Sequence, residues 1–462
     1  MPPVYTPAAI PTDRLTRFSE AIGRVIPDAM STAVGMLLVL GVGALAIGNP
    51  GAAVMDAFYR GLWMLLPFTM QMALILLLSS TLGAAPVFKR AVARLSRLPQ
   101  TRSQVFALSC LVVACLAYLY WGLAIALGPL VSIYFAREAE KKGIEVDFPF
   151  LLATTAAAGS IWQFGLSASA PLLMNTPGHF LEKQTGLMPL STTIWAPATF
   201  VFILTFFIAI IIAARFLHPG RPQPLSQFPD ALKLAEPLLV IAEAEPIDHG
   251  APRPTLSGRV ERSSIPVAIL VAALAAWVYY HFAVKHLGLD LNSLNTVLFG
   301  LALLVHRNVS NFNRALQTAI LSCWPIVVMY HLYGGVAGLL QFTTLGDTIG
   351  GLLATVSTRY TLTLFTALIS TVVACFVPSS GGQWVIQGYV TVTAASAVGA
   401  SAQQGLLALS IGDQMGNLLT PFWAAVGGGI ARIDFRRFIG YQFAYAAIWF
   451  VLGVLMFTFL PL

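Results

Sequence analysis

The run at residues 378–384, PSSGGQW, constrains the fold of this chain more than any other feature. It interrupts a stretch without charged residues, with residues 361–377 before it and residues 385–399 after it. Proline and paired glycines break a helix, and in lipid each freed backbone N–H or C=O group costs several kcal/mol unless protein or a water-filled cavity satisfies it. Broken backbone at membrane depth is typical of substrate or ion sites in secondary transporters. The alternative is two ordinary helices joined by a surface turn.

The composition predicts a membrane protein. Hydrophobic residues make up 57% of the 462 residues and charged residues only 10%, which excludes an ordinary soluble domain. A chain of this length has room for roughly ten spans of about 20 residues each. The net charge of +7 does not indicate nucleic-acid binding, because the basic residues flank hydrophobic segments.

The hydrophobic pattern predicts nine spans and two longer segments. The spans are expected near 30–48, 61–82, 148–174, 191–214, 265–283, 291–306, 317–340, 404–425 and 438–460. The segments near 104–136 and 361–398 are too long for one span, yet each arm, at roughly 15–17 residues, is short of the 20 or so needed to cross. We interpret both as re-entrant hairpins. Two full crossings in each would leave the sidedness of every other segment unchanged.

The basic residues predict the orientation. With a cytoplasmic N-terminus, all but four of the 26 Lys and Arg residues fall on the inner side. The four outer ones are Arg60, Lys183, Lys285 and Arg359. Such a bias follows the positive-inside rule, so we expect the N-terminus in the cytoplasm and the C-terminus outside.

The order of elements repeats along the chain as span, span, hairpin, interrupted span and closing span. The predicted parts are a cytoplasmic amphipathic segment (1–28), a first transmembrane repeat (29–214), a Pro-rich cytoplasmic linker (215–264), a linking transmembrane helix (265–290) and a second repeat (291–462). The unmatched linking helix shifts the second repeat by one crossing, so the repeats run in opposite directions. The pattern predicts an all-α polytopic membrane protein, an inverted-repeat transporter with about nine spans, two re-entrant hairpins and two interrupted helices.

Four irregular segments are expected to meet and form a site. They are the turn of the first hairpin near 118–122, the interrupted span at 159–171 with 175–178, the run at 378–384 and a second interruption at 412–417 with 420–423. None contains a cationic side chain, whereas hydroxyls, amides and backbone N–H groups at half-helix N-termini suit a small monocarboxylate. Tryptophan would enclose an alkyl tail. The predicted substrate-binding residues are Trp162, Gln163, Ser167, Ser169, Ser379, Ser380, Gly381, Gly382, Gln383 and Trp384.

An ionisable residue inside a span is costly and is therefore a candidate for function, which singles out Asp413. We expect it to take up a coupling proton or to help bind Na+; the alternative is a carboxylate that caps a half-helix or pairs within the bundle. The predicted coupling-ion residues are Asp413, Gln414, Asn417, Asn175 and Thr176. His331 is either a proton relay or a buried histidine hydrogen-bonded across helices, and the second interpretation is favoured. No cofactor and no other metal site is predicted.

Enzymatic and ATP-driven functions lack their motifs. The segment 165–169, GLSAS, misses the final glycine of a nucleophile elbow, so we predict no hydrolase and no enzyme. The chain has no GxxxxGK[ST] run that would bind a nucleotide phosphate.

Several motifs along nearly the whole chain match one transporter family. They are residues 25–28, 68–74, 135–138, 167–172, 176–178 and above all 377–388, VPSSGGQWVIQG, supported by Gln414, Asn417 and 421–423. The sequence thereby resembles the bacterial short-chain fatty acid transporter family of the ion-transporter superfamily.

That resemblance implies uptake of short-chain fatty acids such as acetoacetate or butyrate through the bacterial inner membrane, coupled to H+ or Na+. It also implies a homodimer in which a mobile domain slides against a fixed scaffold. Gln383 and Asp413 stand where other members carry histidine and glutamate, and Gln163 lies where they have a more glycine-rich stretch. These departures leave the exact substrate open. A carrier of another small organic anion and a passive anion channel are the alternatives.

Overall fold

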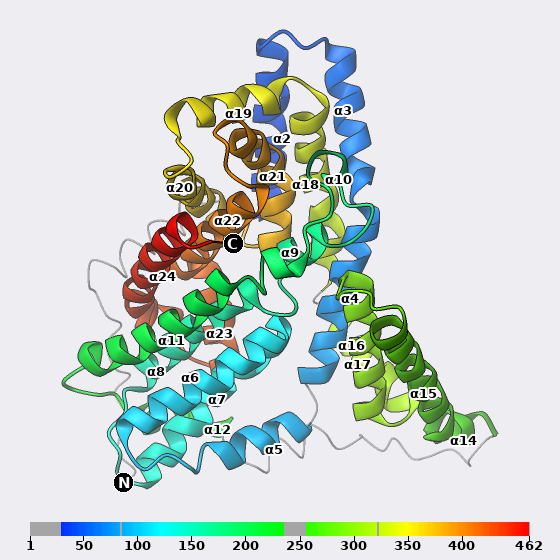
Figure 1. Ribbon diagram of the computed structural model, residues 1–462. Helices are drawn as coiled ribbons and strands as arrows, with labels where there is room; N and C mark the ends of the chain where they lie inside the picture. The colour runs from blue at the N-terminus through cyan, green and yellow to red at the C-terminus, as the bar shows by residue number, and fades with distance from the viewer. Residues whose placement is uncertain (1–28, 84–85, 235–255, 321–322, 462) are drawn as a thin grey trace.

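The computed structural model describes residues 29–83, 86–234, 256–320 and 323–461 (Figure 1). The predicted amphipathic segment 1–28 and the part of the linker at 235–255 lie outside the described residues. Every regular element in the described part is a helix, which confirms the all-α prediction.

The helices form two groups that lie side by side (Figure 1). The scaffold group comprises α2 (Ala29–Ala46), α3 (Gly51–Met64), α4 (Leu66–Gly83), α15 (Ile265–Tyr279), α16 (Leu291–His306), α17 (Val309–Ala319) and α18 (Trp324–Phe342). The hairpin group comprises α6 (Arg102–Leu119), α7 (Trp121–Lys141), α8 (Phe148–Gly159), α9 (Ser169–Met174), α11 (Pro197–Leu217), α20 (Leu362–Ala374), α21 (Ser380–Ala397), α22 (Ala402–Leu419) and α24 (Ile439–Phe459). The shorter connecting elements are α5 (Pro86–Leu95), α10 (Glu182–Thr185), α12 (Pro229–Lys233), α14 (Leu256–Arg262), α19 (Leu345–Val356), α23 (Pro421–Ala431), η1 (Ser160–Phe164), η2 (Leu190–Thr192), η3 (Leu225–Gln227), η4 (Tyr280–Val284) and η6 (Phe435–Arg437).

Several helices have the length and composition of membrane spans. Six in the described part are long and apolar enough to cross, or seven if α18 and α19, which meet at 75°, count as one bent span. Large apolar side chains are exposed on these helices, such as Ile212 on α11 and Ile269 on α15. The total of about nine spans stays a prediction.

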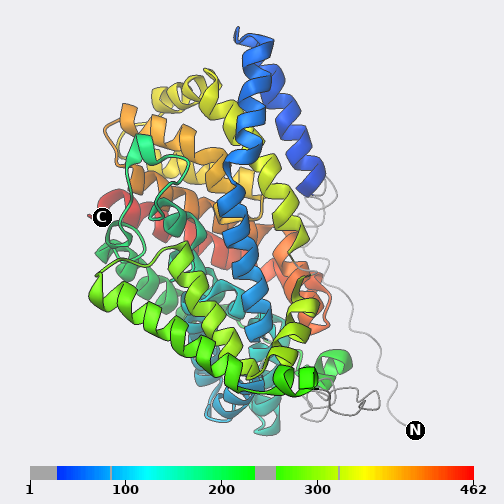
Figure 2. The same ribbon diagram turned by 90° about the vertical axis from the view of Figure 1, so that its right-hand side faces the viewer.

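The second scaffold span is longer than predicted. Instead of beginning at residue 61, helix starts at Gly51 and continues through α3 and α4 to Gly83, 33 residues in all. At 1.5 Å per residue it extends for about 50 Å, beyond the ~30 Å hydrocarbon core of a bilayer. Figure 2 shows this helix running along most of the height of the molecule. The hydrophobic pattern did not predict the first turns of this helix, because Asp56 and Arg60 interrupt the hydrophobic run at 51–60.

Three glycines bring α3 and α18 into backbone contact. A Cβ atom added to Gly61 would lie 2.3 Å from the Gly334 carbonyl oxygen. One added to Gly338 would lie 2.3 Å from the Ala57 oxygen. Small residues at this spacing let transmembrane helices approach closely and gain van der Waals contact. The scaffold group is therefore held together by backbone proximity.

Both predicted hairpin segments form pairs of helices, and three of the four arms are longer than predicted. The first turns at the single extended residue Tyr120 (φ −162°, ψ 116°) between the 18 residues of α6 and the 21 residues of α7. Both of these helices are long enough to cross a membrane, so the expectation of short arms is wrong here. In the second hairpin α20 has 13 residues and α21 has 18. Whether the hairpins are re-entrant stays a prediction.

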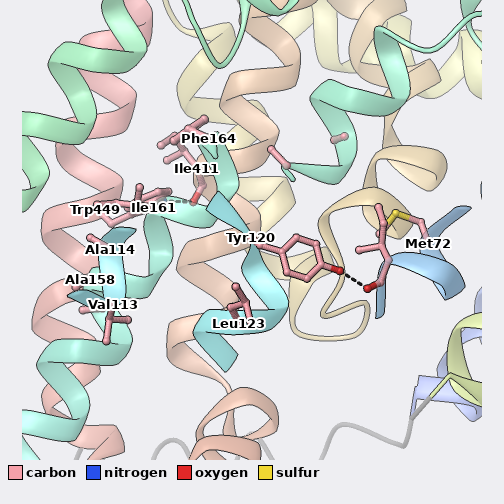
Figure 3. Close-up of a cluster of buried hydrophobic side chains, with 14 of the residues drawn as sticks. Met72, Val113, Ala114, Tyr120, Leu123, Ala158, Ile161, Phe164, Ile411 and Trp449 are labelled. Atoms are coloured by element: carbon pink, nitrogen blue, oxygen red, sulfur yellow. Dashed lines mark hydrogen bonds between the residues drawn. The ribbon is translucent and has the colours of Figure 1, made fainter. Parts of the chain in front are cut away.

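The first interrupted span is confirmed. After α8 the chain tightens into the 3₁₀ helix η1, becomes irregular and resumes helix in α9. An aromatic cluster holds the break in place, since Phe164 stacks on Trp449 with ring centroids 5.6 Å apart. The Trp449 indole N–H donates to the Ile411 carbonyl oxygen at 3.0 Å (Figure 3). The irregular backbone is thus packed against α22 and α24.

The second interruption lies in the later part of the predicted segment, at Thr420. α22 remains helical through 412–417 and ends at Leu419, and α23 begins at Pro421, which has no N–H to continue the ladder. Gly412 and Gly416 serve close packing instead. A Cβ at Gly412 would lie 2.1 Å from the Ala367 oxygen, and one at Gly416 would lie 2.5 Å from the Ala374 Cβ. These glycines let α22 pack closely against α20, and they do not interrupt the helix.

The described start of the linker docks on the hairpin group through Asp147. Its carboxylate accepts the Phe150 N–H at 2.7 Å, which caps α8, and the Gln223 N–H at 2.9 Å. Burial raises the pKa of Asp147, while the two N–H donors act in the opposite direction. Phe228 packs on Phe148 with ring centroids 5.4 Å apart. The segment after α11 is therefore fastened to the first turn of α8.

Replacing Asp147 with alanine should lower the stability of the hairpin group by about 1–2 kcal/mol, because a cap and a loop N–H lose their acceptor. Thermal unfolding of the detergent-purified protein measures the effect. Asp147→Asn keeps one amide oxygen and should lose less, and Asp230→Ala, whose side chain is 67% exposed, should change nothing. An unchanged melting temperature in Asp147→Ala would contradict the fastening role.

Candidate functional site

A cavity of about 770 Å³ lies between the scaffold and hairpin groups. Its walls come from α4 and α18 on one side and from α7, α8, α22 and α23 on the other. The described residues that line it include no Lys, Arg, His, Asp or Glu. Its polar lining consists of Ser79, Ser80, Trp121, Thr155, Ser160, Trp162, Ser169, Tyr330, Tyr333, Ser379, Ser380, Gln414, Asn417 and Gln442.

Part of the predicted site lies on this cavity. The predicted residues that line it are Trp162, Ser169, Ser379, Ser380, Gln414 and Asn417. The others stand behind the wall or elsewhere: Gln163, Ser167, Gly381, Gly382, Gln383, Trp384, Asp413, Asn175 and Thr176. The four irregular segments do converge, but many of their polar side chains bond to one another.

The N-terminal tip of α21 forms the polar centre of the wall. Ser379 caps the helix, accepting the Gly382 N–H at 3.4 Å, and its Oγ lies 2.9 Å from the Tyr330 hydroxyl. Ser380 is 1% exposed and its Oγ has no hydrogen-bond partner. A Cβ at Gly381 would lie 2.9 Å from the Phe68 ring and 3.1 Å from the Ser169 Oγ. Glycine therefore lets this tip reach both the scaffold and the start of α9.

Gln383 and Trp384 are structural rather than cavity residues. The Gln383 amide donates to the Ser370 carbonyl and hydroxyl oxygens, each at 2.9 Å, and thereby joins the two arms of the second hairpin. Trp384 is fully buried and packs beside Gly388. Neither side chain lines the cavity, because both face neighbouring helices, and their contact with substrate stays a prediction.

Ser167 joins the two irregular segments of the first repeat. Its Oγ accepts the Trp121 backbone N–H at 2.9 Å, and the Leu166 N–H donates to the Tyr118 oxygen at 2.7 Å. The irregular segment after η1 therefore supplies hydrogen-bond partners for backbone groups in the turn of the first hairpin. The Tyr120 side chain points across this region and donates to the Ile75 carbonyl oxygen of α4 (Figure 3).

Asp413 lies directly behind the cavity wall in a cluster of amides. It is fully buried, and its Oδ2 accepts the Gln163 side-chain N–H and the Asn417 N–H, the latter at 3.0 Å. The Gln414 amide donates to the Ser160 Oγ at 2.8 Å. Three oxygens here have no partner: Asp413 Oδ1, Gln163 Oε1 and Asn417 Oδ1. In the described part of the chain no cationic side chain pairs with Asp413, and its hydrogen-bond donors are the side-chain amides of Gln163 and Asn417.

Asn175, Thr176 and His331 lie outside this cluster. The Asn175 amide donates to the Leu289 oxygen at 2.9 Å, and Thr176 accepts the Leu291 N–H at 3.3 Å, so both tie α9 to the start of α16. The His331 Nδ1 lies 2.9 Å from the Leu62 oxygen on α3. This contact across two helices agrees with the favoured interpretation of His331, although the side chain is half-buried rather than buried.

A sequence model of the short chain fatty acid transporter family matches residues 12–460. The chain belongs to this family. A protein of Escherichia coli K12 is 27% identical over 452 residues, which cover 96% of this chain and 99% of the relative. A protein of Haemophilus influenzae is 26% identical over 441 residues, which cover 93% and 95%. The names of both relatives propose short-chain fatty acid transport.

The fold of this family member matches a solved transporter. The crystal structure of the Alcanivorax borkumensis YdaH transporter, described as revealing an unusual topology, aligns with a TM-score of 0.59 over 94% of this chain and 98% of that one. At 15% identity the likeness concerns the fold alone. This family member is therefore a multi-pass membrane protein with a transporter fold.

Sequence reasoning passed over several cavity residues. Tyr330 and Tyr333 have no predicted role, and Trp121 enters only as part of the turn at 118–122. Gln442, whose Oε1 has no partner, was not considered at all. A polar aromatic or amide inside an apolar helix was the available signal, since such groups need a partner when buried.

Proposed function

We propose that this protein is a secondary transporter that takes up short-chain monocarboxylates such as acetoacetate or butyrate. The observation that carries the proposal is a cavity without charged lining whose polar groups gather at broken helices, in a member of the short-chain fatty acid transporter family. The absence of a cation among the described lining residues favours an anion of low charge over a dicarboxylate or a phosphate ester.

The tip of α21 is the proposed carboxylate site. The first N–H groups of a helix have no intrahelical partner, and at α21 these include the backbone N–H groups of Ser380 and Gly381. These N–H groups lie at the positive end of the helix dipole, where an anion is stabilised. The unpartnered Ser380 hydroxyl adds a donor. Apolar side chains of the same cavity, such as Leu76, Val113 and Phe422, would surround the alkyl tail.

The proposed coupling ion, H+ or Na+, binds at Asp413. Either cation would neutralise a carboxylate that is fully buried without a cationic partner in the described structure. The unpartnered oxygens of Gln163 and Asn417 would help hold Na+, which prefers oxygen ligands, or accept a hydrogen bond from the protonated acid. Because Gln163 and Asn417 come from the two interrupted spans, ion binding would draw those spans together.

The orientation and assembly are part of the same proposal. The charge bias supports an inner-membrane protein with a cytoplasmic N-terminus and an external C-terminus. The recurring order of hairpin and interrupted span supports inverted repeats at 29–214 and 291–462. The family resemblance also implies a homodimer in which a mobile domain slides against a fixed scaffold.

Uptake by purified protein in liposomes tests this function. Labelled butyrate and acetoacetate would be offered under Na+, pH and voltage gradients imposed one at a time. Saturable accumulation under a Na+ or pH gradient is the expected result. Flux that neither saturates nor responds to an ion gradient would indicate the passive channel, and transport of other anions alone would indicate the other carrier.

Ser380→Ala should lower the apparent affinity for butyrate by about tenfold or more, because a hydrogen bond to a charged group is worth roughly 1.5–3 kcal/mol. Initial uptake rates over a range of butyrate concentrations measure it. Ser396→Ala is the matched control, since Ser396 lies on the exposed face of the same helix. Wild-type kinetics in Ser380→Ala would remove the tip of α21 as the carboxylate site.

A further inference from the structure

We propose that Tyr333 and Trp121 complete the carboxylate site that Ser380 begins, so that one substrate is held by three separate elements. The inference rests on the proposed function and assigns two residues that sequence reasoning left without a role. Both line the cavity, and each carries a buried donor without a hydrogen-bond partner.

Tyr333 brings the scaffold group into the site. It lies on α18, is 1% exposed, and its hydroxyl has no partner. One turn earlier, the Tyr330 hydroxyl is already engaged by Ser379 at 2.9 Å. The Tyr333 ring packs against the tip of α21, where a Cβ at Gly382 would lie 3.0 Å from it. Glycine at 382 therefore keeps this tyrosine beside the first turn of α21.

Trp121 brings the first hairpin into the site. It is the first residue of α7, and its backbone N–H is occupied by the Ser167 Oγ at 2.9 Å. Its ring lies 6.4 Å from the Trp162 ring, so the two indoles line one side of the cavity. The Trp121 indole N–H is buried and unpartnered.

Unpartnered buried donors are costly, at roughly 1–3 kcal/mol each, and are therefore uncommon unless a ligand satisfies them. Among the described residues of the cavity wall, such donors are Trp121 Nε1, Tyr333 Oη and Ser380 Oγ. A carboxylate accepts up to about four hydrogen bonds, so three neutral donors suit one carboxylate well. The remaining unpartnered groups on the wall, Asn417 Oδ1 and Gln442 Oε1, are acceptors and would repel a second carboxylate.

The donors belong to different parts of the fold. Ser380 and Trp121 come from the two hairpins, whereas Tyr333 comes from the scaffold group. A bound monocarboxylate would consequently bridge the two groups of helices, and the donors that select a carboxylate would lie at their boundary. Substrate binding would then stabilise the contact between α21 and α18.

Tyr333→Phe tests the inference, because it removes the hydroxyl and keeps the ring. Affinities for butyrate and for the neutral isostere butyramide would be measured by titration calorimetry on detergent-purified protein. A hydrogen bond to a charged acceptor is about twice as strong as one to a neutral acceptor, so the variant should lose about tenfold in butyrate affinity and much less for butyramide. Trp121→Phe should shift the same ratio. Tyr360→Phe, an exposed tyrosine, is the control.

The outcomes separate the two proposals. A fall in the butyrate-to-butyramide ratio in both variants supports the three-donor site. Equal losses for both ligands, or an unchanged ratio, would show that these side chains act only in packing and would overturn the inference. If the wild-type protein binds no monocarboxylate, the proposed function itself fails.

Discussion

Asp413→Asn should abolish gradient-driven accumulation of substrate, lowering it by roughly a hundredfold or more. The buried carboxylate is the proposed binding group of the coupling cation, and a buried charge contact is worth about 3 kcal/mol or more, which corresponds to that factor. Asparagine keeps the shape of the side chain and can still bond Gln163 and Asn417. Concentrative uptake of labelled butyrate into proteoliposomes under a Na+ or pH gradient measures the loss.

Exchange without a gradient distinguishes a coupling defect from a folding defect. Asp413→Asn should still exchange labelled for unlabelled butyrate, since the cavity wall is unchanged. Asp413→Glu restores the charge and should recover part of the accumulation, whereas Asp56→Asn, with a 65% exposed side chain, should behave as wild type. Full accumulation by Asp413→Asn under both gradients would remove this residue from coupling.

Gly338→Leu should prevent the scaffold group from assembling. Its Cβ would lie 2.3 Å from the Ala57 oxygen and 2.6 Å from the Gly61 Cα, both backbone atoms that no side-chain rearrangement can move. Separating α3 from α18 would forfeit their contact along several turns, at a cost above about 3 kcal/mol. The yield of monodisperse protein by size-exclusion chromatography and its melting temperature measure the effect.

Gly41→Leu is the matched control for this substitution. Gly41 lies on α2 of the same scaffold group, and a Cβ there would meet nothing within 4 Å. It should express and melt as the wild type does. A Gly338→Leu protein with normal yield and stability would show that α3 and α18 tolerate separation.

Hydropathy and helix-breaking residues predicted the fold well, because both act locally. Pro378 interrupts the helix, so the second hairpin was visible in the sequence, whereas Gly381 and Gly382 lie in the first turn of α21. Gly412 and Gly416 misled for the same reason: glycine also permits close helix packing, and only the position of α20 decides between the two roles. The sequence at 412–417 does not by itself show where α20 lies.

The site was predicted in part, because its polar residues satisfy one another over long distances. Gln383 looked like a ligand-binding amide, but its partner Ser370 stands on the facing arm of the hairpin. Tyr333, in contrast, belongs to no motif in the sequence, and only the fold brings it to the tip of α21. A buried donor is recognised as free or satisfied only once every neighbour is known.

The charge of the buried groups fixes how membrane voltage can act on transport. Apart from Asp147 at the start of α8, Asp413 is the only buried carboxylate in the described part of the chain, and the cavity wall adds no charge. Under the proposed coupling at Asp413, one such carboxylate would bind one monovalent cation per cycle. A monocarboxylate that moves with one cation carries no net charge across the bilayer. The ~2.3 kcal/mol that 100 mV supplies per charge would then contribute nothing, and accumulation would be set by the chemical gradient of the ion alone.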